Sequence, residues 1–216
     1  MNRLGVAEYG WENSGATHAH SYLLPVVERA LDDAARRNKL PAEGLQIFDA
    51  GCGNGYLAGY FLSKGHKVAG CDASEEGVNL ARESFPQGVF EVASVYDNLA
   101  GKFGAHWDVV ISTEVVEHLY DPRTYARNVS AMLRPGGMFI VTTPYHGYLR
   151  NLVLVLTGKM DSHFTALWDG GHIKFWSVKT LSALLSGAGF SVDAFYGAGR
   201  VPYIWKSMVL AAYKNA

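Results

Sequence analysis

Short apolar runs alternate along the chain with segments whose apolar residues recur at helical spacing. The runs of strand length lie at residues 45–50, 67–71, 89–93, 107–112 and 138–143. Helical spacing is found at 21–38, 56–63 and from 74 to about 85. Strands that alternate with helices form parallel sheets with right-handed crossovers. The pattern therefore predicts an α/β fold with a sheet that is parallel through its first five strands.

Polar residues mark the starts of two of the predicted helices. Ser21 is expected to cap the N-terminal helix, with Pro25 tolerated in the first turn. Ser74 is expected to cap the helix that follows the second strand. Glu75 and Glu76 come next, where the helix dipole favours negative charge. Both helices are therefore expected to begin at a serine.

The last third of the chain departs from this alternation. Residues 145–177 are rich in aromatic residues and histidine, and 178–188 predict a helix closed by Gly189. Residues 190–195 and 204–213 predict two final strands. We therefore expect a single domain over 1–216, in which 1–44 form an N-terminal helical cap and 145–177 a substrate-side insert.

A glycine turn follows the first predicted strand. In IFDAGCGNGYLA, at residues 47–58, Gly51, Gly53 and Gly55 alternate with other residues, so backbone can approach a ligand without an intervening Cβ. Asp49 ends the strand and suits a ligand with a positive charge, whereas a phosphate prefers bare N–H groups. A dinucleotide fingerprint fits poorly, because its third glycine position is occupied by Tyr56.

Asp72 ends the second predicted strand, beside the glycine turn in a doubly wound sheet. A carboxylate at this position can accept hydrogen bonds from both hydroxyls of a ribose. An ordinary turn aspartate is the alternative. The glycine turn upstream favours the ribose interpretation.

Two motifs resemble those of class I S-adenosylmethionine-dependent methyltransferases. D-A-G-C-G-N-G, from Asp49, resembles the first motif of the family, and L-R-P-G-G-x-F-I-V-T-T-P, from Leu133, resembles its fifth-strand motif. The resemblance covers residues 45–144 with specific motifs. It implies a doubly wound, seven-stranded, mostly parallel sheet with an antiparallel last strand. It also implies an enzyme that uses S-adenosyl-L-methionine and methylates a small molecule.

The resemblance also assigns residues to the cofactor. Those expected to bind it are Asp49, Gly51, Cys52, Gly53, Asp72, Ala73, Ser94, Val95, Thr113 and Glu114. The family often has an acid near Ser94 that holds the adenine amino group. This chain has Asp97 three residues later, and a backbone contact from Val95 can substitute for the acid.

The run E-V-V-E-H places Glu114, Glu117 and His118 on one face if the segment is helical. It resembles the same stretch of the ubiquinone-pathway O-methyltransferases, where it borders the methyl-transfer site. Three interpretations stay open. His118 is a general base or polariser, or both glutamates and His118 hold a divalent ion, or Glu114 contacts cofactor while the other two brace the turn. No other metal-ligand spacing stands out, so the expected default is no resident metal.

The insert leaves the carboxyl end of the fifth strand, where ligands bind in open α/β sheets. His146 and His172 are alternative bases, although histidines among aromatic residues also serve as packing residues. Residues 149–156 are apolar on nearly every side but too short to span a bilayer. They predict a lid, a homodimer contact, or a segment that dips into a membrane interface to receive a lipophilic acceptor.

Methyl transfer to an oxygen is the preferred chemistry, with support from the E-V-V-E-H resemblance. The alternatives are N- or C-methylation of a sugar or natural product, and a catalytically silent cofactor-binding subunit. A nicotinamide-dependent reductase is disfavoured because the Tyr-x-x-x-Lys pattern is missing. T-T-P-Y at 142–145 replaces the N-P-P-Y motif of base methylation, which disfavours DNA as the substrate.

Composition narrows the class of protein and its cellular location. Apolar residues make up 49% and charged residues 18% of the 216-residue chain, as in ordinary globular domains. A net charge of −1 argues against a general nucleic-acid binder. Cys52 and Cys71 lack C-x-x-C spacing, so they are interpreted as small buried residues in a reducing compartment and not as a disulfide or a zinc site. No signal-peptide core or transmembrane run is found, so a cytoplasmic location without stable membrane insertion is expected.

Overall fold

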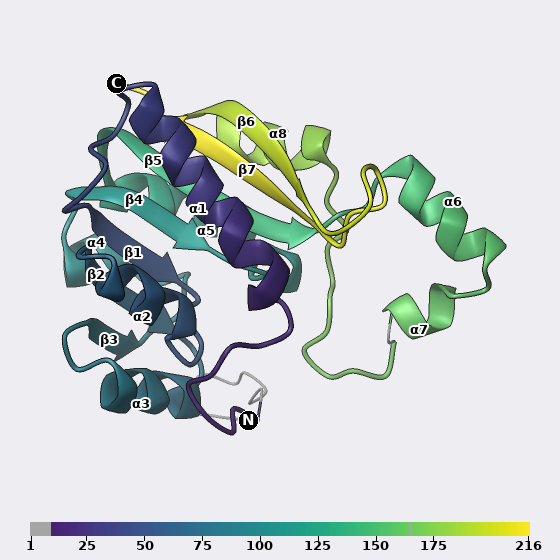
Figure 1. Cartoon of the computed structure of the whole chain (residues 1–216), viewed down its shortest axis with the longest axis horizontal. Helices are drawn as coiled ribbons and strands as arrows, with labels where there is room; N and C mark the ends of the chain where they lie inside the picture. The colour runs from purple at the N-terminus through teal and green to yellow at the C-terminus, as the bar shows by residue number, and fades with distance from the viewer. Residues whose placement is uncertain (1–9, 165) are drawn as a thin grey trace.

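The structure, a computed structural model, describes residues 10–164 and 166–216 and contains one seven-stranded sheet in the order β3-β2-β1-β4-β5-β7-β6 (Figure 1). The strands are β1 (Gln46–Ala50), β2 (Lys67–Asp72), β3 (Val89–Val92), β4 (Trp107–Ser112), β5 (Leu133–Pro144), β6 (Phe190–Ala198) and β7 (Ser207–Lys214). Strands β1 to β5 pair in parallel, whereas β7 is antiparallel to both β5 and β6. The predicted fold class is confirmed.

Helices cover both faces of the sheet. On one face lie α1 (His20–Arg36), α2 (Tyr56–Ser63) and α3 (Glu75–Ser84). On the other lie α4 (Leu99–Phe103), α5 (Pro122–Met132) and α8 (Val178–Ser186). The 3-10 helix η1 (Val116–His118) follows β4. Two helices of the insert, α6 (Tyr148–Leu156) and α7 (Met160–Phe164), project beyond the end of the sheet (Figure 1).

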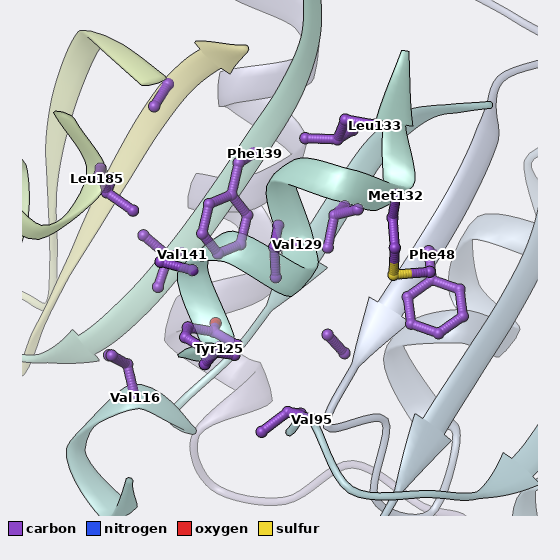
Figure 2. Packing of buried hydrophobic residues seen from close by; sticks show 14 of the residues in the cluster. Phe48, Val95, Val116, Tyr125, Val129, Met132, Leu133, Phe139, Val141 and Leu185 are labelled. Carbon is purple, nitrogen blue, oxygen red and sulfur yellow. The ribbon is translucent and has the colours of Figure 1, made fainter. Parts of the chain in front are cut away.

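The core between the sheet and α5 fixes the strand ends that carry the site. Tyr125 and Phe139 are fully buried and pack edge to face, with ring centroids 6.0 Å apart. Figure 2 shows Val129, Met132 and Phe48 in the same cluster. Burial of one such side chain contributes about 1.5–3 kcal/mol. The packing of α5 against the sheet therefore holds in place the carboxyl ends of β4 and β5, which carry the site.

One of the two predicted serine caps is confirmed and the other is wrong. The Ser74 hydroxyl accepts a hydrogen bond from the Gly77 amide at 3.1 Å and caps α3. Helix α1, however, begins one residue before Ser21, and the Ser21 hydroxyl donates to the His18 carbonyl. The serine lies inside the first turn, where its oxygen bonds back to the chain instead of capping the helix.

The expected N-terminal cap at 1–44 includes residues 1–9, and the expected insert at 145–177 includes residue 165, all outside the described residues. The described part of the cap contains α1, which packs against the sheet through Leu23, Val27 and Ala30. No helix within 10–164 or 166–216 is long and apolar enough to cross a bilayer.

Candidate functional site

The glycine turn between β1 and α2 requires glycine for both conformation and space. Gly51 has a φ of +91° and Gly53 a φ of +50°, in the left-handed region. A Cβ on Gly51 would lie 2.3 Å from the Val115 side chain. The amides of Gly51 and Cys52 both donate to the Cys71 carbonyl, at 2.8 and 2.9 Å, and tie the turn to β2. The turn therefore presents bare backbone at the carboxyl edge of the sheet.

A segment before α1 covers this turn. A Cβ on Gly53 would lie 2.7 Å from the Trp11 ring. The Asn54 side chain donates to the carbonyls of Asn13 and Gly15, at 2.8 and 3.0 Å. The sequence did not predict a role for Trp11. No motif connects a glycine turn with a residue some forty positions before it.

Asp72 lies beside the turn, as predicted. Its carboxylate accepts hydrogen bonds from the amides of Gly53 and Ser74, both at 2.8 Å. These bonds brace the turn, which is what the turn-aspartate interpretation requires. Each carboxylate oxygen can accept a second bond, so the predicted contact with ribose stays compatible with this geometry.

Asp49 is the most unusual group at the turn. Its side chain is 2% exposed, and no described residue donates a hydrogen bond to either carboxylate oxygen. Burial, helped by the charge of Asp72, raises the pKa of Asp49 to about 7. A buried carboxylate without a partner costs free energy, which a cationic ligand group would offset.

The residues expected near the adenine follow β3. The Ser94 amide donates to the Asp97 carboxylate at 3.0 Å, so Asp97 turns back towards its own loop. The Val95 carbonyl accepts from the Asn128 side chain at 3.0 Å. Ala73 follows β2 directly, and its place next to Asp72 puts it at the same edge of the sheet.

Glu114 follows β4 and Thr113, with its backbone at a φ of +53°. Its carboxylate accepts from the Thr142 hydroxyl at 2.7 Å and from the Ser207 hydroxyl at 3.0 Å. Burial raises the pKa of Glu114 to about 7. Because the left-handed backbone separates Glu114 from η1 (Val116–His118), the segment is not one helix, and the condition under which Glu114 would share a face with Glu117 and His118 is not met.

His118 instead meets a histidine of the insert. Ligand atoms of Glu117, His118 and His172 lie within 4.8 Å of one another, so His172 takes the place expected for Glu114 in a metal set. Nδ1 of His118 lies 2.7 Å from the Gly170 carbonyl, which can only accept. Nδ1 therefore carries the proton and Nε2 carries the lone pair.

Glu117 is fully buried beneath these histidines. No hydrogen bond from the described residues reaches its carboxylate oxygens, and His172 Nε2 is 4.0 Å away. Burial and the charge of Glu114 raise the pKa of Glu117 well above its usual value, although the nearby Thr143 hydroxyl and the backbone of Glu117 itself oppose this rise. A buried carboxylate with two imidazoles is a donor set that fits Zn²⁺ or another divalent ion.

A cavity of about 620 Å³ adjoins this cluster. It is lined by His146, Asn151, Phe164, Ala166, His172, Phe175 and Ser177. Burial lowers the pKa of both His146 and His172 to about 4, so both imidazoles are neutral at pH 7. The predicted alternative bases thus lie on the cavity wall, while His118 lies beside His172, with ring centroids 4.9 Å apart.

A family model described as a methyltransferase domain matches residues 16–194. A ubiquinone biosynthesis O-methyltransferase of Caulobacter sp. strain K31 is 30% identical over 171 residues, which cover 76% of this chain and 66% of that protein. The protein of that name from Sinorhizobium medicae is 37% identical over 109 residues, or 50% and 44% of the two chains. This chain therefore spans only part of the length of these relatives.

The fold is shared with solved structures. Magnesium protoporphyrin IX methyltransferase from Synechocystis, with bound SAH, superimposes with a TM-score of 0.65 at 20% identity, covering 93% of this chain and 89% of that one. A methyltransferase from Mesorhizobium loti gives a TM-score of 0.63 at 20% identity, with 85% and 100% covered. At these identities the likeness concerns the fold.

Proposed function

The chain belongs to the S-adenosylmethionine-dependent methyltransferases, and we propose that it transfers the methyl group to a hydroxyl oxygen of a small molecule. The choice of oxygen as the methyl-accepting atom rests on one observation. The carbonyl of Gly170 fixes the tautomer of His118 so that Nε2 carries the lone pair, and the His118 ring lies beside His172, which lines the cavity that would receive the acceptor. A hydroxyl acceptor must lose a proton, and a neutral imidazole can take it. The names of the curated relatives support the same chemistry.

The cofactor supplies an activated methyl group on a sulfonium. The glycine turn, Asp49 and Asp72 would hold its cationic and ribose parts, and the adjoining cavity would hold the acceptor. The bound cofactor would supply the methyl group to the acceptor oxygen, with the electron pair of the carbon–sulfur bond going to sulfur. Nε2 of His118 would take the proton of the hydroxyl. The protein contributes mainly orientation and exclusion of water.

A divalent cation is a second way to use the same residues. Glu117, His118 and His172 fit one, because the Glu117 carboxylate is buried without a hydrogen bond from the described residues. Such an ion would lower the pKa of an acceptor hydroxyl and polarise its oxygen. His118 would then act as a ligand, and the acceptor proton would leave to another base.

Replacement of His118 tests the proposal. With a panel of phenols and the labelled cofactor, His118→Gln should slow turnover by about a hundredfold or more and leave the affinity for S-adenosylhomocysteine unchanged. His172→Gln is the matched control for the metal interpretation. If His118 is the base, EDTA has no effect on turnover and His172→Gln slows it only slightly. If a metal acts, EDTA and both substitutions abolish turnover. A normal rate in His118→Gln would contradict both roles.

A further inference from the structure

The residues before α1 pass along the carboxyl edge of the sheet, and we call residues 10–19 the strap. Figure 1 shows the strap in dark purple, running from beside α3 to the start of α1. At its first end the Trp11 indole packs on the glycine turn and on α3. A Cβ on Gly53 would lie 2.7 Å from the Trp11 ring, and a Cβ on Gly77 would lie 3.0 Å from its Nε1.

The other end of the strap is attached beside β7. Nζ of Lys206 donates to Nε2 of His18 at 2.6 Å. Lys206 directly precedes β7, whose first residue, Ser207, pairs with Pro144 at the end of β5. In the sheet, β1 and β4 lie between β2 and β5. The strap therefore passes the carboxyl ends of β1, β4 and β5, which carry the residues assigned to the cofactor.

Between its ends the strap is held mainly by polar contacts. The buried side-chain amide of Asn54 donates to the carbonyls of Asn13 and Gly15. Where the strap joins α1, His20 stacks on Tyr56 of α2, with ring centroids 4.7 Å apart. Most residues of the strap are exposed, so it can open at low cost without unfolding of the domain. Opening takes two acceptors from the buried Asn54 amide, which favours closing again.

The Trp11 indole lies beside the predicted ribose position. The Asp72 carboxylate accepts from the amides of Gly53 and Ser74. The indole covers Gly53 and also the first turn of α3, which Ser74 caps. An aromatic ring at this place can pack against the nucleoside of a bound cofactor, because a nucleobase stacks readily on aromatic side chains.

We propose that the strap is the gate of the cofactor site. It detaches from the glycine turn to let the cofactor in and out, and it closes with Trp11 against the bound nucleoside. Trp11 then sets the rate of cofactor exchange and helps to exclude water during transfer. This role concerns the cofactor alone, so it holds whichever atom receives the methyl group.

Hydrogen exchange of the full chain, read by mass spectrometry, tests whether the strap opens. Exchange over residues 10–19 is compared without ligand and with saturating S-adenosylhomocysteine. It should slow by about tenfold or more in the complex, because the ligand adds contacts to the closed strap and not to the open one. Equal exchange in the two states would overturn the proposal, since a fixed brace of the glycine turn behaves in that way.

Replacement of Trp11 tests the closing contact. Labelled S-adenosylhomocysteine is bound to the protein and chased with an excess of unlabelled ligand. Trp11→Ala should release it about tenfold faster or more, the scale of one lost aromatic contact, and Trp11→Phe should keep part of the slow release because a ring remains. Glu12→Ala, at the exposed neighbouring residue, is the matched control and should release the ligand as the wild type does.

An unchanged release rate in a folded Trp11→Ala variant would overturn the role of Trp11. So would a higher affinity for S-adenosylhomocysteine in that variant, because the indole would then occupy the place of the nucleoside instead of closing over it. The exchange comparison uses the wild-type protein, so it decides whether the strap opens even if Trp11→Ala fails to fold.

Discussion

Replacement of Asp49 by asparagine should stabilise the ligand-free protein and weaken its binding of cofactor. Asp49 is 2% exposed, and its carboxylate accepts no hydrogen bond from the described residues. Asparagine has nearly the same shape and carries no charge. The variant therefore removes the cost of a buried anion and, with it, the partner that we assign to a cationic group of the cofactor.

The magnitude follows from the pKa of Asp49, which is raised from 3.8 to about 7. Between those values the folded protein holds the proton more tightly than the unfolded chain does. The free energy of unfolding therefore falls as the pH rises from about 4 to about 7, and it stays lower above pH 7. A tenfold difference in proton affinity between the folded and unfolded states corresponds to about 1.4 kcal/mol, so the loss is at most about 4 kcal/mol. An asparagine side chain does not titrate, so Asp49→Asn should escape this loss.

Urea denaturation of both proteins at pH 4.5 and 7.5 measures the effect. The two should be similarly stable at pH 4.5, and Asp49→Asn should be the more stable at pH 7.5. Other buried acids titrate in both proteins and cancel in the difference. Calorimetry at pH 7.5 should show S-adenosylhomocysteine binding weakened by about tenfold or more, the scale of a lost charged hydrogen bond. Equal pH dependence in the two proteins, or unchanged affinity, would refute the reasoning.

Two further predictions concern the same site. Asp72→Ala should weaken the binding of S-adenosylhomocysteine by about 1.5–3 kcal/mol, measured by calorimetry, because a carboxylate that can accept from ribose is lost; unchanged affinity in a folded variant would contradict the contact between Asp72 and the ribose. The pH profile of kcat should fall in acid solution with its midpoint below pH 6.5, because burial lowers the pKa of His118 from 6.5 and a protonated imidazole cannot accept the hydroxyl proton. A midpoint above pH 6.5 would contradict that role.

The parts of the fold that were predictable depend on local pattern. Strand β4 was predicted with its bounds unchanged, because a short, mostly apolar run between polar segments determines it. Ser74 was predicted as a cap because the cap, the first turn and the apolar stripe all lie within a few residues. Ser21 has the same residue type, but α1 begins one residue earlier, at His20, and local pattern does not resolve such a shift.

The site was less predictable wherever backbone conformation or distant segments decide it. A face shared by Glu114 and Glu117 required a helical segment, and the left-handed backbone of Glu114 breaks that helix. His172 joins His118 only because the insert folds back over η1, where the amides of Ile173 and Lys174 donate to the Glu117 carbonyl. Contacts between segments so far apart depend on the tertiary fold, which spacing within one segment does not encode.

The most direct test of the account is to identify the atom that receives the methyl group. The protein is incubated with cofactor carrying a ¹³C-labelled methyl group and a mixture of phenols, aromatic amines and hydroxylated aromatic acids, and the product is read by carbon NMR. The account predicts a single new signal from a methyl ether, reduced by about a hundredfold in His118→Gln. A label on nitrogen or carbon, or an ether formed equally well by His118→Gln, would contradict it.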